Sequence, residues 1–216
     1  MKLVLFGATG NVGRRIAAEA LRRGHDVVGV VRDPSAVSSP DPRIELVQGD
    51  ATNAERIAEI VRGSDAVVSA ISPRPNPRGL PQPRLPDNAR ALIAGLRKAG
   101  VRRVLYVGGG STLEIAPGRQ LLDEPNFPPE YKAEALEGRE ALGIWRTEAA
   151  GLDWTFLSPA IEIGPGERTG KYRTTDETML FDANGKSFIS FEDYAVAVLD
   201  ELERPQHVGR RFGVAY

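Results

Sequence analysis

Three evenly spaced glycines lie near the start of the chain, in the segment GATGNVG at residues 7–13. A short apolar run at residues 3–6 precedes them, and a helical pattern follows through Arg23. A strand that turns directly into a helix exposes the first N–H groups of that helix, which together with the helix dipole attract a pyrophosphate. One glycine would permit the tight turn, one the approach of phosphate, and one close packing of helix on strand. The segment therefore predicts a dinucleotide-binding turn, and the alternative is an ordinary glycine-rich turn.

A cation lies where a dinucleotide-binding fold would meet the adenosine ribose. Arg32 follows the β-rich run DVVGVV and lies 25 residues after Gly7. An arginine at this place pairs with a 2′-phosphate and favours NADP(H), whereas an acid accepts hydrogen bonds from the ribose hydroxyls and favours NAD(H). Arg32 therefore predicts NADP(H). Two alternatives remain open, because Asp33 could take the ribose role and Arg32 could be a solvated surface charge.

Composition limits the kinds of protein that this chain can be. The 216 residues carry a formal net charge of −1, so neither nucleic acid nor an anionic membrane is the expected partner. The chain has no cysteine and only two histidines, far apart, which argues against disulfides, thiolate chemistry and a zinc site. Without an apparent signal peptide or a long apolar stretch, we expect a cytoplasmic protein that is a monomer or a weak homodimer.

Short apolar runs alternate with helical patterns, which is typical of a parallel sheet with helical crossovers. The predicted strands cover residues 3–6, 26–31, 44–48, 65–70, 101–107, 152–159 and 210–216. The predicted helices end at residue 23 or cover residues 53–62, 88–99 with Asp87-Asn88 as cap, 130–150 and 190–203. Residues 167–190, with an Asn184-Gly185 turn, predict a hairpin. The whole predicts one α/β domain over residues 1–216, with three layers and a doubly wound, Rossmann-like, mostly parallel sheet of six or seven strands.

Two irregular segments interrupt this order. Residues 72–86 hold six prolines and three arginines (Arg74, Arg78 and Arg84), a composition that forbids a regular helix. The segment follows the fourth strand on the cofactor side, so its arginines could reach phosphate from a lid. We favour the alternative, a solvated proline-rich connector. Residues 113–129 hold four prolines and predict a substrate loop.

The motifs GATGNVG, VVRDP, QGDAT and LDWTFLSP together resemble the atypical and extended short-chain dehydrogenase/reductase superfamily. Within it the chain is most similar to the NmrA-like proteins and NAD(P)H-flavin reductases. The resemblance and the strand ends together give the following candidates for contact with the dinucleotide: Gly7, Thr9, Gly10, Asn11, Val12, Gly13, Arg32, Asp50, Ala51, Ser69, Ala70, Ile71, Gly108 and Pro159.

The resemblance also implies individual roles. Members of the superfamily use an Asp after the third strand to accept from the adenine amino group, which suggests Asp50, although a turn or cap role would explain it too. They commonly carry a catalytic serine after the fifth strand, where Ser111 and Thr112 lie; Ser111 could equally serve only a turn. Residues 69–71 would follow the ribose. Pro159 would lie near the nicotinamide carboxamide.

The family's proton-relay pair is incomplete in this chain. Catalytic members have Tyr-x-x-x-Lys at the start of the long helix, with the two side chains one turn apart. Tyr131 fits the tyrosine, but Ala135 stands where the lysine belongs, and Lys132 would point some 100° away. Whether Lys132 or Arg139 substitutes is open. The departure argues against alcohol dehydrogenase or epimerase chemistry and fits the flavin-reductase and NmrA-like branches, since a flavin can take a proton from solvent.

These observations lead to three hypotheses. The first is an NADP(H)-dependent oxidoreductase that passes hydride to a small conjugated acceptor, such as a flavin as substrate or a quinone, with Ser111 and Tyr131 beside the acceptor. The second is a non-catalytic, NmrA-like regulatory protein that senses the dinucleotide. The third and weakest is a nucleotide-sugar epimerase or dehydratase, which needs the missing lysine.

Overall fold

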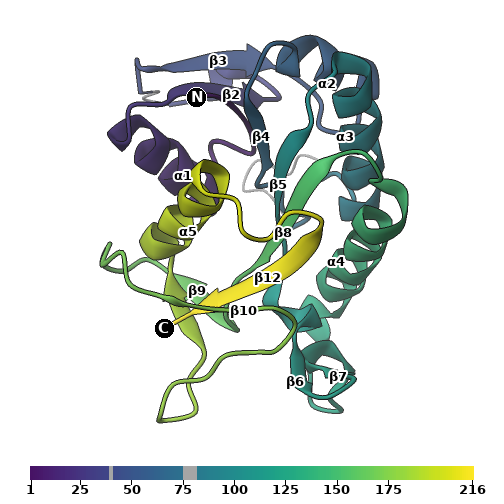
Figure 1. Ribbon diagram of the computed structural model, residues 1–216, viewed down its shortest axis with the longest axis vertical. Helices are drawn as coiled ribbons and strands as arrows, with labels where there is room; N and C mark the ends of the chain where they lie inside the picture. Colours follow the sequence, from purple (N-terminus) through teal and green to yellow (C-terminus); the bar gives the residue numbers. More distant parts are fainter. Residues whose placement is uncertain (39–40, 75–81) are drawn as a thin grey trace.

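A parallel sheet forms the centre of the computed structural model, which describes residues 1–38, 41–74 and 82–216 (Figure 1). The strands of this sheet are β1 (Lys2–Phe6), β2 (Asp26–Val31), β3 (Ile44–Gln48), β4 (Ala66–Ser69), β5 (Arg103–Val107), β8 (Asp153–Ser158), β10 (Arg173–Thr175) and β12 (Arg210–Ala215). Their spatial order is β10-β12-β8-β5-β4-β1-β2-β3. All neighbours are parallel except β10 and β12. The chain order reverses between β1 and β4, where doubly wound sheets bind ligands.

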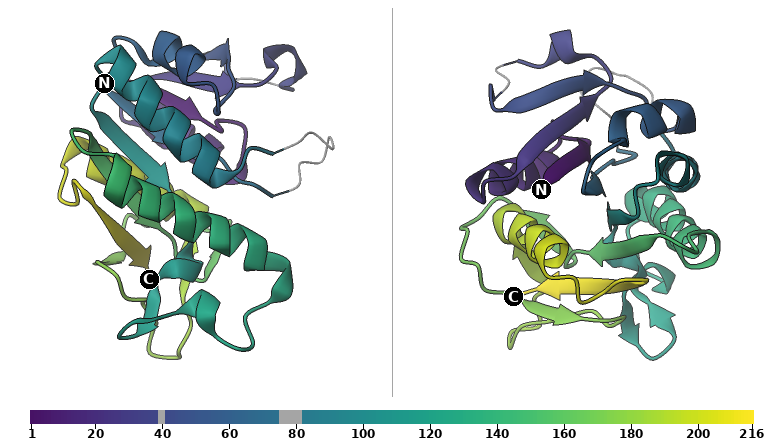
Figure 2. Two further views of the ribbon diagram at one scale, coloured as in Figure 1. Left: turned by 90° about the vertical axis from the view of Figure 1, so that its right-hand side faces the viewer. Right: turned by 45° about the horizontal axis from the view of Figure 1, so that its top comes forward.

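In the part of the chain that the structure describes, five helices cover the two faces of the sheet. They are α1 (Asn11–Arg22), α2 (Ala54–Val61), α3 (Leu85–Ala99), α4 (Pro129–Glu148) and α5 (Phe191–Glu203). Helices α1 and α5 lie side by side on one face, and α2, α3 and α4 cover the other (Figures 1 and 2). The predicted three-layer, Rossmann-like α/β fold is therefore confirmed.

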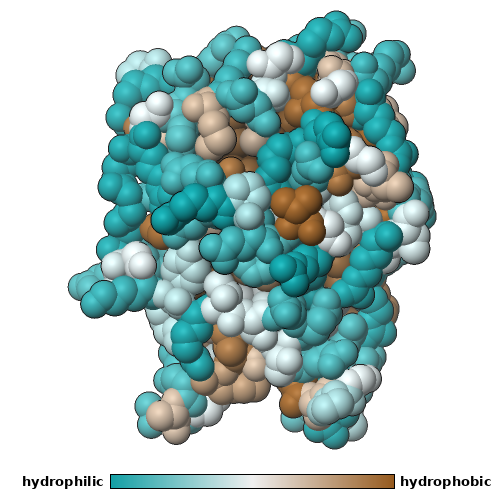
Figure 3. Space-filling view, in the orientation of Figure 1, coloured by the Kyte–Doolittle hydropathy of each residue, from teal (hydrophilic) through white to brown (hydrophobic). Residues whose placement is uncertain are grey.

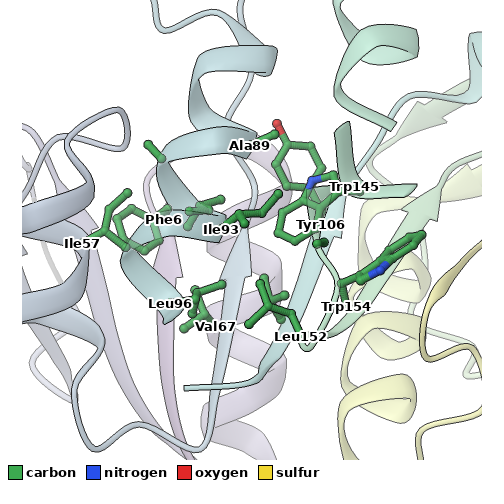
Figure 4. Packing of buried hydrophobic residues seen from close by; sticks show 14 of the residues in the cluster. Phe6, Ile57, Val67, Ala89, Ile93, Leu96, Tyr106, Trp145, Leu152 and Trp154 are labelled. Atoms are coloured by element: carbon green, nitrogen blue, oxygen red, sulfur yellow. The ribbon is translucent and has the colours of Figure 1, made fainter. Parts of the chain in front are cut away.

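Burial on both faces explains why the strands lack a polar alternation. In β1, Val4 and Phe6 point into the core beneath α2, α3 and α4, whereas Leu3 and Leu5 point into the core beneath α1 and α5. All four side chains are at most 1% exposed. The first of these cores is rich in aromatic rings, among which Tyr106 stacks on Phe156 with 5.3 Å between ring centroids. Figure 4 shows Tyr106 between the helices and the sheet, close to Trp145.

The edge of the sheet differs from the prediction. Over the described ranges the sheet has eight strands rather than six or seven, because β10 pairs with the outer edge of β12. The predicted hairpin over residues 167–190 is wrong, since its two ends pair elsewhere: β10 joins the main sheet, and β11 (Phe188–Ser190) pairs in parallel with β9 (Glu162–Gly164). The Asn184-Gly185 turn does form, closed by a hydrogen bond from Asp182 N to Lys186 O of 2.8 Å. Residues 113–129 contain a further small ladder of β6 (Glu114–Ala116) and β7 (Arg119–Gln120).

A buried carboxylate ties the loop after β9 to α1. Glu19 is 5% exposed and accepts hydrogen bonds from Arg22, Arg23 and Arg168, the last at 2.8 and 2.9 Å. Burial raises the pKa of Glu19, but the three guanidinium groups outweigh it and hold this pKa well below its ordinary value. The loop therefore has a fixed anchor on the helix that carries the glycine turn.

The face of the molecule seen in the orientation of Figure 1 is predominantly polar. Figure 3 shows a mainly hydrophilic face on which apolar side chains are dispersed rather than gathered into one broad patch. Within residues 1–38, 41–74 and 82–216, none of the helices has the length and apolar character needed to cross a bilayer.

Candidate functional site

A cleft with a volume of about 2020 Å³ runs along the carboxyl ends of the parallel strands. This volume is about twice the upper end of the range typical of small-molecule sites, about 1,000 Å³. One part, which we call the cofactor half, lies over the ends of β1, β2 and β3. The other part, the acceptor half, continues past β4, β5 and β8 to α4 and the start of α5. The cleft therefore offers room for a dinucleotide and a second molecule.

The glycine turn joins β1 to α1 at the centre of this cleft. Gly7 has φ +80°, and a Cβ there would lie 2.5 Å from the carbonyl oxygen of Ala70. A Cβ on Gly13 would lie 2.0 Å from the carbonyl oxygen of Gly7. Gly7 therefore permits the turn and Gly13 permits close packing of helix on strand, two of the three reasons that the spacing suggested. Gly10 is the N-cap of α1 and lines the cleft.

The N-terminus of α1 suits an anion. Among the described residues, no side chain caps this helix, and its first turn holds no acidic residue. The turn and the first helical residues line the cleft at Thr9, Asn11 and Val12. The exposed N–H groups and the positive end of the helix dipole therefore fit the diphosphate of a dinucleotide.

The part of the cofactor half next to the ends of β2 and β3 carries Arg32, Asp33 and Asp50, all exposed side chains that line the cleft. The Asp33 carboxylate accepts hydrogen bonds from Ser35 N at 3.0 Å and Ser35 Oγ at 2.6 Å, so it serves as a cap of the following turn. Asp50 Oδ1 accepts from the backbone and hydroxyl of Thr52 at 2.8 and 2.7 Å. Asp50 therefore stabilises the turn after β3, as one of its two predicted roles requires. Its other oxygen, Oδ2, takes no part in these two bonds, so the adenine role can coexist with the turn.

Asn88 does not lie where the sequence pattern predicts it. It was expected as an N-terminal cap, but α3 begins at Leu85 with Pro86 in its first turn, and this places Asn88 one turn inside and fully buried. Its amide donates to Ala51 O at 2.7 Å and accepts from Ser69 Oγ at 2.9 Å. Asn88 thus joins the ends of β3 and β4 beneath the cleft. Pro86 is the residue in the sequence that indicates the earlier start of α3, because proline favours the first turn of a helix.

The loop after β5 brings Ser111 to the acceptor half. Ser111 lies in the short helical turn Gly110–Thr112 and lines the cleft with Gly109. Gly109 is not needed for packing, because an added Cβ would meet only Ser111 Oγ, at 3.7 Å. Without a side chain at this position, a bound molecule can approach the backbone of the loop closely. The neighbouring glycines serve packing instead, since a Cβ on Gly108 would overlap Phe156 and one on Gly110 would lie 2.5 Å from Pro159 O.

Thr112, the alternative to Ser111, does not line the cleft. It is 1% exposed, and both its hydroxyl and its carbonyl oxygen accept hydrogen bonds from the buried Arg211, at 2.9 and 2.8 Å. Thr112 therefore anchors the loop on β12. This contact joins residues 99 positions apart, which explains why the local sequence did not reveal it.

Tyr131 lies at the start of α4 on the wall of the acceptor half, with 49% of its surface exposed. Neither proposed substitute for the missing lysine is beside it. Lys132 donates to Leu122 O at 2.5 Å, and Arg139 pairs with Asp123 at 2.6 Å. The cation near Tyr131 is Arg74, whose guanidinium lies 5.7 Å from the centroid of the tyrosine ring.

A second tyrosine of the cleft is occupied. The hydroxyl of Tyr194, on α5, donates to Leu157 O at 2.7 Å, and burial raises its pKa well above the ordinary value. Tyr194 therefore serves packing and not proton transfer. This leaves Tyr131 as the accessible tyrosine among the described residues that line the cleft.

The ends of the proline-rich segment are fixed on α4. Arg74 Nε lies 2.8 Å from Glu134, and Arg84 pairs with Glu137 at 3.3 Å. These contacts fit the connector better than a phosphate-binding lid, since both arginines face carboxylates. Arg78 lies outside the described residues. Leu85 and Pro86, at the end of the segment, form the first turn of α3, so the expectation of no regular helix is wrong for these two positions.

Most of the predicted site residues meet in one cleft. The predicted residues that line it are Gly7, Thr9, Gly10, Asn11, Val12, Arg32, Asp50, Ala51, Ala70, Ile71, Gly108, Ser111, Tyr131 and Pro159. Gly13 and Ser69 lie just beneath its surface and support it from behind. In the part of the chain that the structure describes, there is no group of three His, Cys, Asp or Glu side chains suited to a metal ion.

The fold and the glycine turn together define a Rossmann-like, dinucleotide-binding protein of the short-chain dehydrogenase/reductase type. Comparison with known families agrees, since the model of a family described as NAD(P)H-binding matches residues 7–205. The chain belongs to this NAD(P)H-binding family of atypical short-chain dehydrogenase/reductases.

Several relatives match over nearly the whole chain. The uncharacterized protein YwnB of Bacillus subtilis is 39% identical, and the match covers 99% of this chain and 98% of YwnB. A "putative exported protein" from Burkholderia pseudomallei has a solved structure with 45% identity, a TM-score of 0.89 and full coverage of both chains. A "putative NADH-flavin reductase" from Streptococcus pneumoniae is 33% identical with a TM-score of 0.84, covering 100% of this chain and 99% of its own.

Proposed function

We propose that the protein is an NADP(H)-dependent reductase that passes hydride to a flat, conjugated acceptor such as a flavin or a quinone. The observation that carries this proposal is the continuous cleft, whose cofactor half leads directly into an acceptor half lined by aromatic side chains. These aromatic residues are Phe127, Tyr131, Phe188 and Phe191. Aromatic walls favour planar ring systems, which stack on them.

The cofactor half supports NADP(H) over NAD(H). Arg32 lies at the end of β2, where a guanidinium can pair with the 2′-phosphate. The competing residue, Asp33, already accepts two hydrogen bonds from Ser35, which weakens its claim to the ribose hydroxyls. Gly7, Gly10 and the first residues of α1 would hold the diphosphate, and Asp50 Oδ2 would accept from the adenine amino group.

The acceptor half supports positioning rather than a proton relay. When bound, the reduced nicotinamide supplies a hydride, and one proton from water completes the reduced acceptor. Ser111 and Tyr131 would hold the acceptor by hydrogen bonds from opposite walls. Because no lysine partner lies one turn from Tyr131, acceptors that need a strong general acid are poor candidates. The name of the Streptococcus pneumoniae relative agrees with this class of acceptor.

Steady-state oxidation of NADPH with riboflavin and a panel of quinones tests the proposal. We expect acceptor-dependent oxidation that saturates with NADPH and is faster with NADPH than with NADH. Rates equal to the enzyme-free background with every acceptor would refute the reductase function.

The second candidate is a dinucleotide sensor without turnover. The specific observation in its favour is that Lys132 and Arg139 both point to other partners, so the relay of the catalytic relatives is not restored in space. A partner protein whose affinity for this chain changes between NADP⁺ and NADPH would support it. Cofactor-independent affinity would count against it.

A further inference from the structure

The acceptor half of the cleft has an unusual balance of charges. The charged side chains that line it, among the described residues, are Arg74, Glu124, Glu134 and Glu162. The single arginine is paired, since Arg74 Nε lies 2.8 Å from Glu134 Oε2. The other two glutamates pair with cations outside the cleft, at 3.2 and 3.5 Å. Among the described residues, carboxylates therefore outnumber cations on this wall, and all four of these charged side chains are ion-paired.

The cofactor half carries equal numbers of arginines and aspartates, namely Arg32, Arg56, Asp33 and Asp50. The uncapped N-terminus of α1 and the guanidinium of Arg32 lie there. The electrostatic potential at the α1 N-terminus and Arg32 therefore favours phosphate groups in the cofactor half. The acceptor half is lined by aromatic rings and carboxylates instead. An anionic group in the acceptor half would lose part of its hydration and would meet Glu134 beside Arg74, the one cation among the described residues that line this half.

Arg74 is held in place by two neighbours on α4. Its guanidinium lies over the ring of Tyr131, and its Nε contacts Glu134, three residues further along the same helix. Its backbone N–H also donates to Ser72 Oγ at 3.3 Å. An incoming phosphate that binds Arg74 would lie beside the carboxylate of Glu134, which already contacts Arg74 Nε. Such a like-charge neighbour is a means of rejecting a wrong ligand.

We propose that the acceptor half selects uncharged acceptors over anionic ones, and that Glu134 sets this selectivity by neutralising Arg74. This inference rests on the proposed reductase function, and it names the acceptor class as neutral planar molecules such as riboflavin or an unsubstituted quinone. Glu134 then acts as a specificity-determining residue.

Riboflavin and FMN provide a sharp test, because they share one ring system and differ by a phosphate that carries nearly two negative charges at pH 8. We would measure the Kd of each flavin by fluorescence quenching in the presence of saturating NADP⁺, and kcat/KM of each with NADPH. The wild-type protein should prefer riboflavin by about tenfold or more. Glu134→Gln should raise the relative affinity for FMN about tenfold, the size expected for one charge-assisted contact.

Two further variants make the result specific. Glu130→Gln removes the same charge from an exposed residue of α4 that does not line the cleft, and it should leave the riboflavin-to-FMN ratio unchanged. Adding Arg74→Gln to Glu134→Gln should abolish the gain in FMN binding. Thermal unfolding of each variant confirms that it is folded.

The outcomes separate the two proposals. If FMN binds as tightly as riboflavin, or Glu134→Gln and Glu130→Gln shift the ratio equally, the inference is overturned while the reductase function stands. If the predicted flavin preference is found in the binding measurement but NADPH is not oxidised, the inference is supported and the reductase function fails. If neither flavin binds, the inference is overturned, and NADPH oxidation with the quinones then decides the reductase function.

Discussion

The glycine turn gives the most direct test of how the structure holds a dinucleotide. Replacing Gly13 with alanine would place a Cβ 2.0 Å from the carbonyl oxygen and 2.8 Å from the carbonyl carbon of Gly7. Both are backbone atoms of the turn, and the same carbonyl accepts a hydrogen bond from Gly10 N at 3.0 Å. No flexible side chain can absorb the overlap, so the start of α1 must move away from β1.

The size of this movement sets the expected effect. A contact of about 3 Å or more requires a shift of about 1 Å, which costs about 1–3 kcal/mol in a packed interior. N–H···O bonds tolerate donor–acceptor distances of about 2.7–3.2 Å, so a shift of about 1 Å breaks at least one bond to the diphosphate. One charge-assisted bond contributes about 1.5–3 kcal/mol, or about ten- to hundredfold in affinity.

Calorimetric titration with NADPH and urea denaturation would measure both effects of Gly13→Ala. The matched control is Gly143→Ala, in the middle of α4, where an added Cβ meets no atom within 4 Å. This control should keep NADPH binding and raise the free energy of unfolding by about 1 kcal/mol. If Gly13→Ala binds NADPH within twofold of the wild type and is equally stable, the close approach of helix to strand is not what forms the site.

Three further predictions follow from other contacts. Arg32→Ala should weaken NADPH binding about ten- to hundredfold and NADH binding less than twofold, since only NADPH carries the 2′-phosphate; titration with both cofactors measures this. Asn88→Ala should lower the free energy of unfolding by about 3 kcal/mol in urea, because it leaves Ser69 Oγ and Ala51 O without their buried partner. In Glu19→Gln the free energy of unfolding should fall less steeply with decreasing pH than it does in the wild type. The folded-state pKa of Glu19 is depressed, so its contribution is complete above the ordinary value of 4.5 and declines below it, by up to about 1.4 kcal/mol per pH unit.

Each of these predictions has a result that contradicts it. Equal losses of NADPH and NADH binding in Arg32→Ala would show that the arginine does not read the 2′-phosphate. An unchanged urea midpoint for Asn88→Ala would mean that the two strand ends are held by other contacts. Parallel stability curves of Glu19→Gln and the wild type between pH 5 and pH 3 would show that the arginine cluster does not depress the pKa of this carboxylate.

Local sequence patterns predicted the central strands and α5, because apolar runs and cap residues within each segment determine these elements. The strands β2 (Asp26–Val31) and β3 (Ile44–Gln48) lie where their apolar runs are, and α5 begins after Ser190, which accepts from Asp193 N at 2.9 Å as a cap should. The spacing of Ser190 and Asp193 is typical of a capping box, but its second bond does not form, because Ser190 N donates to the Tyr216 hydroxyl and not to Asp193. The carboxylate of Asp193 instead accepts from Thr169 and Gly170, residues of a distant loop.

The parts that sequence reasoning missed depend on pairing over long distances. The three-residue strands β9, β10 and β11 are too short to show a period, and their partners lie 26 to 42 residues away. In the site, the glycine spacing was enough to place the diphosphate end. The position of Arg74 beside Tyr131 was not predictable, since 57 residues separate them and nothing in the intervening sequence specifies their contact.

The short strand β10 determines how the sheet ends. Residues Arg211–Ala215 of β12 are buried, and an uncovered strand of this kind would offer a row of N–H and C=O groups to another chain. The three residues of β10 occupy that row, and they bring Arg173 and two threonines, of which Arg173 and Thr174 are exposed, to the new edge. A brief polar strand is a poor template for further pairing. By pairing with the buried strand β12, the antiparallel strand β10 therefore protects the protein from edge-to-edge aggregation.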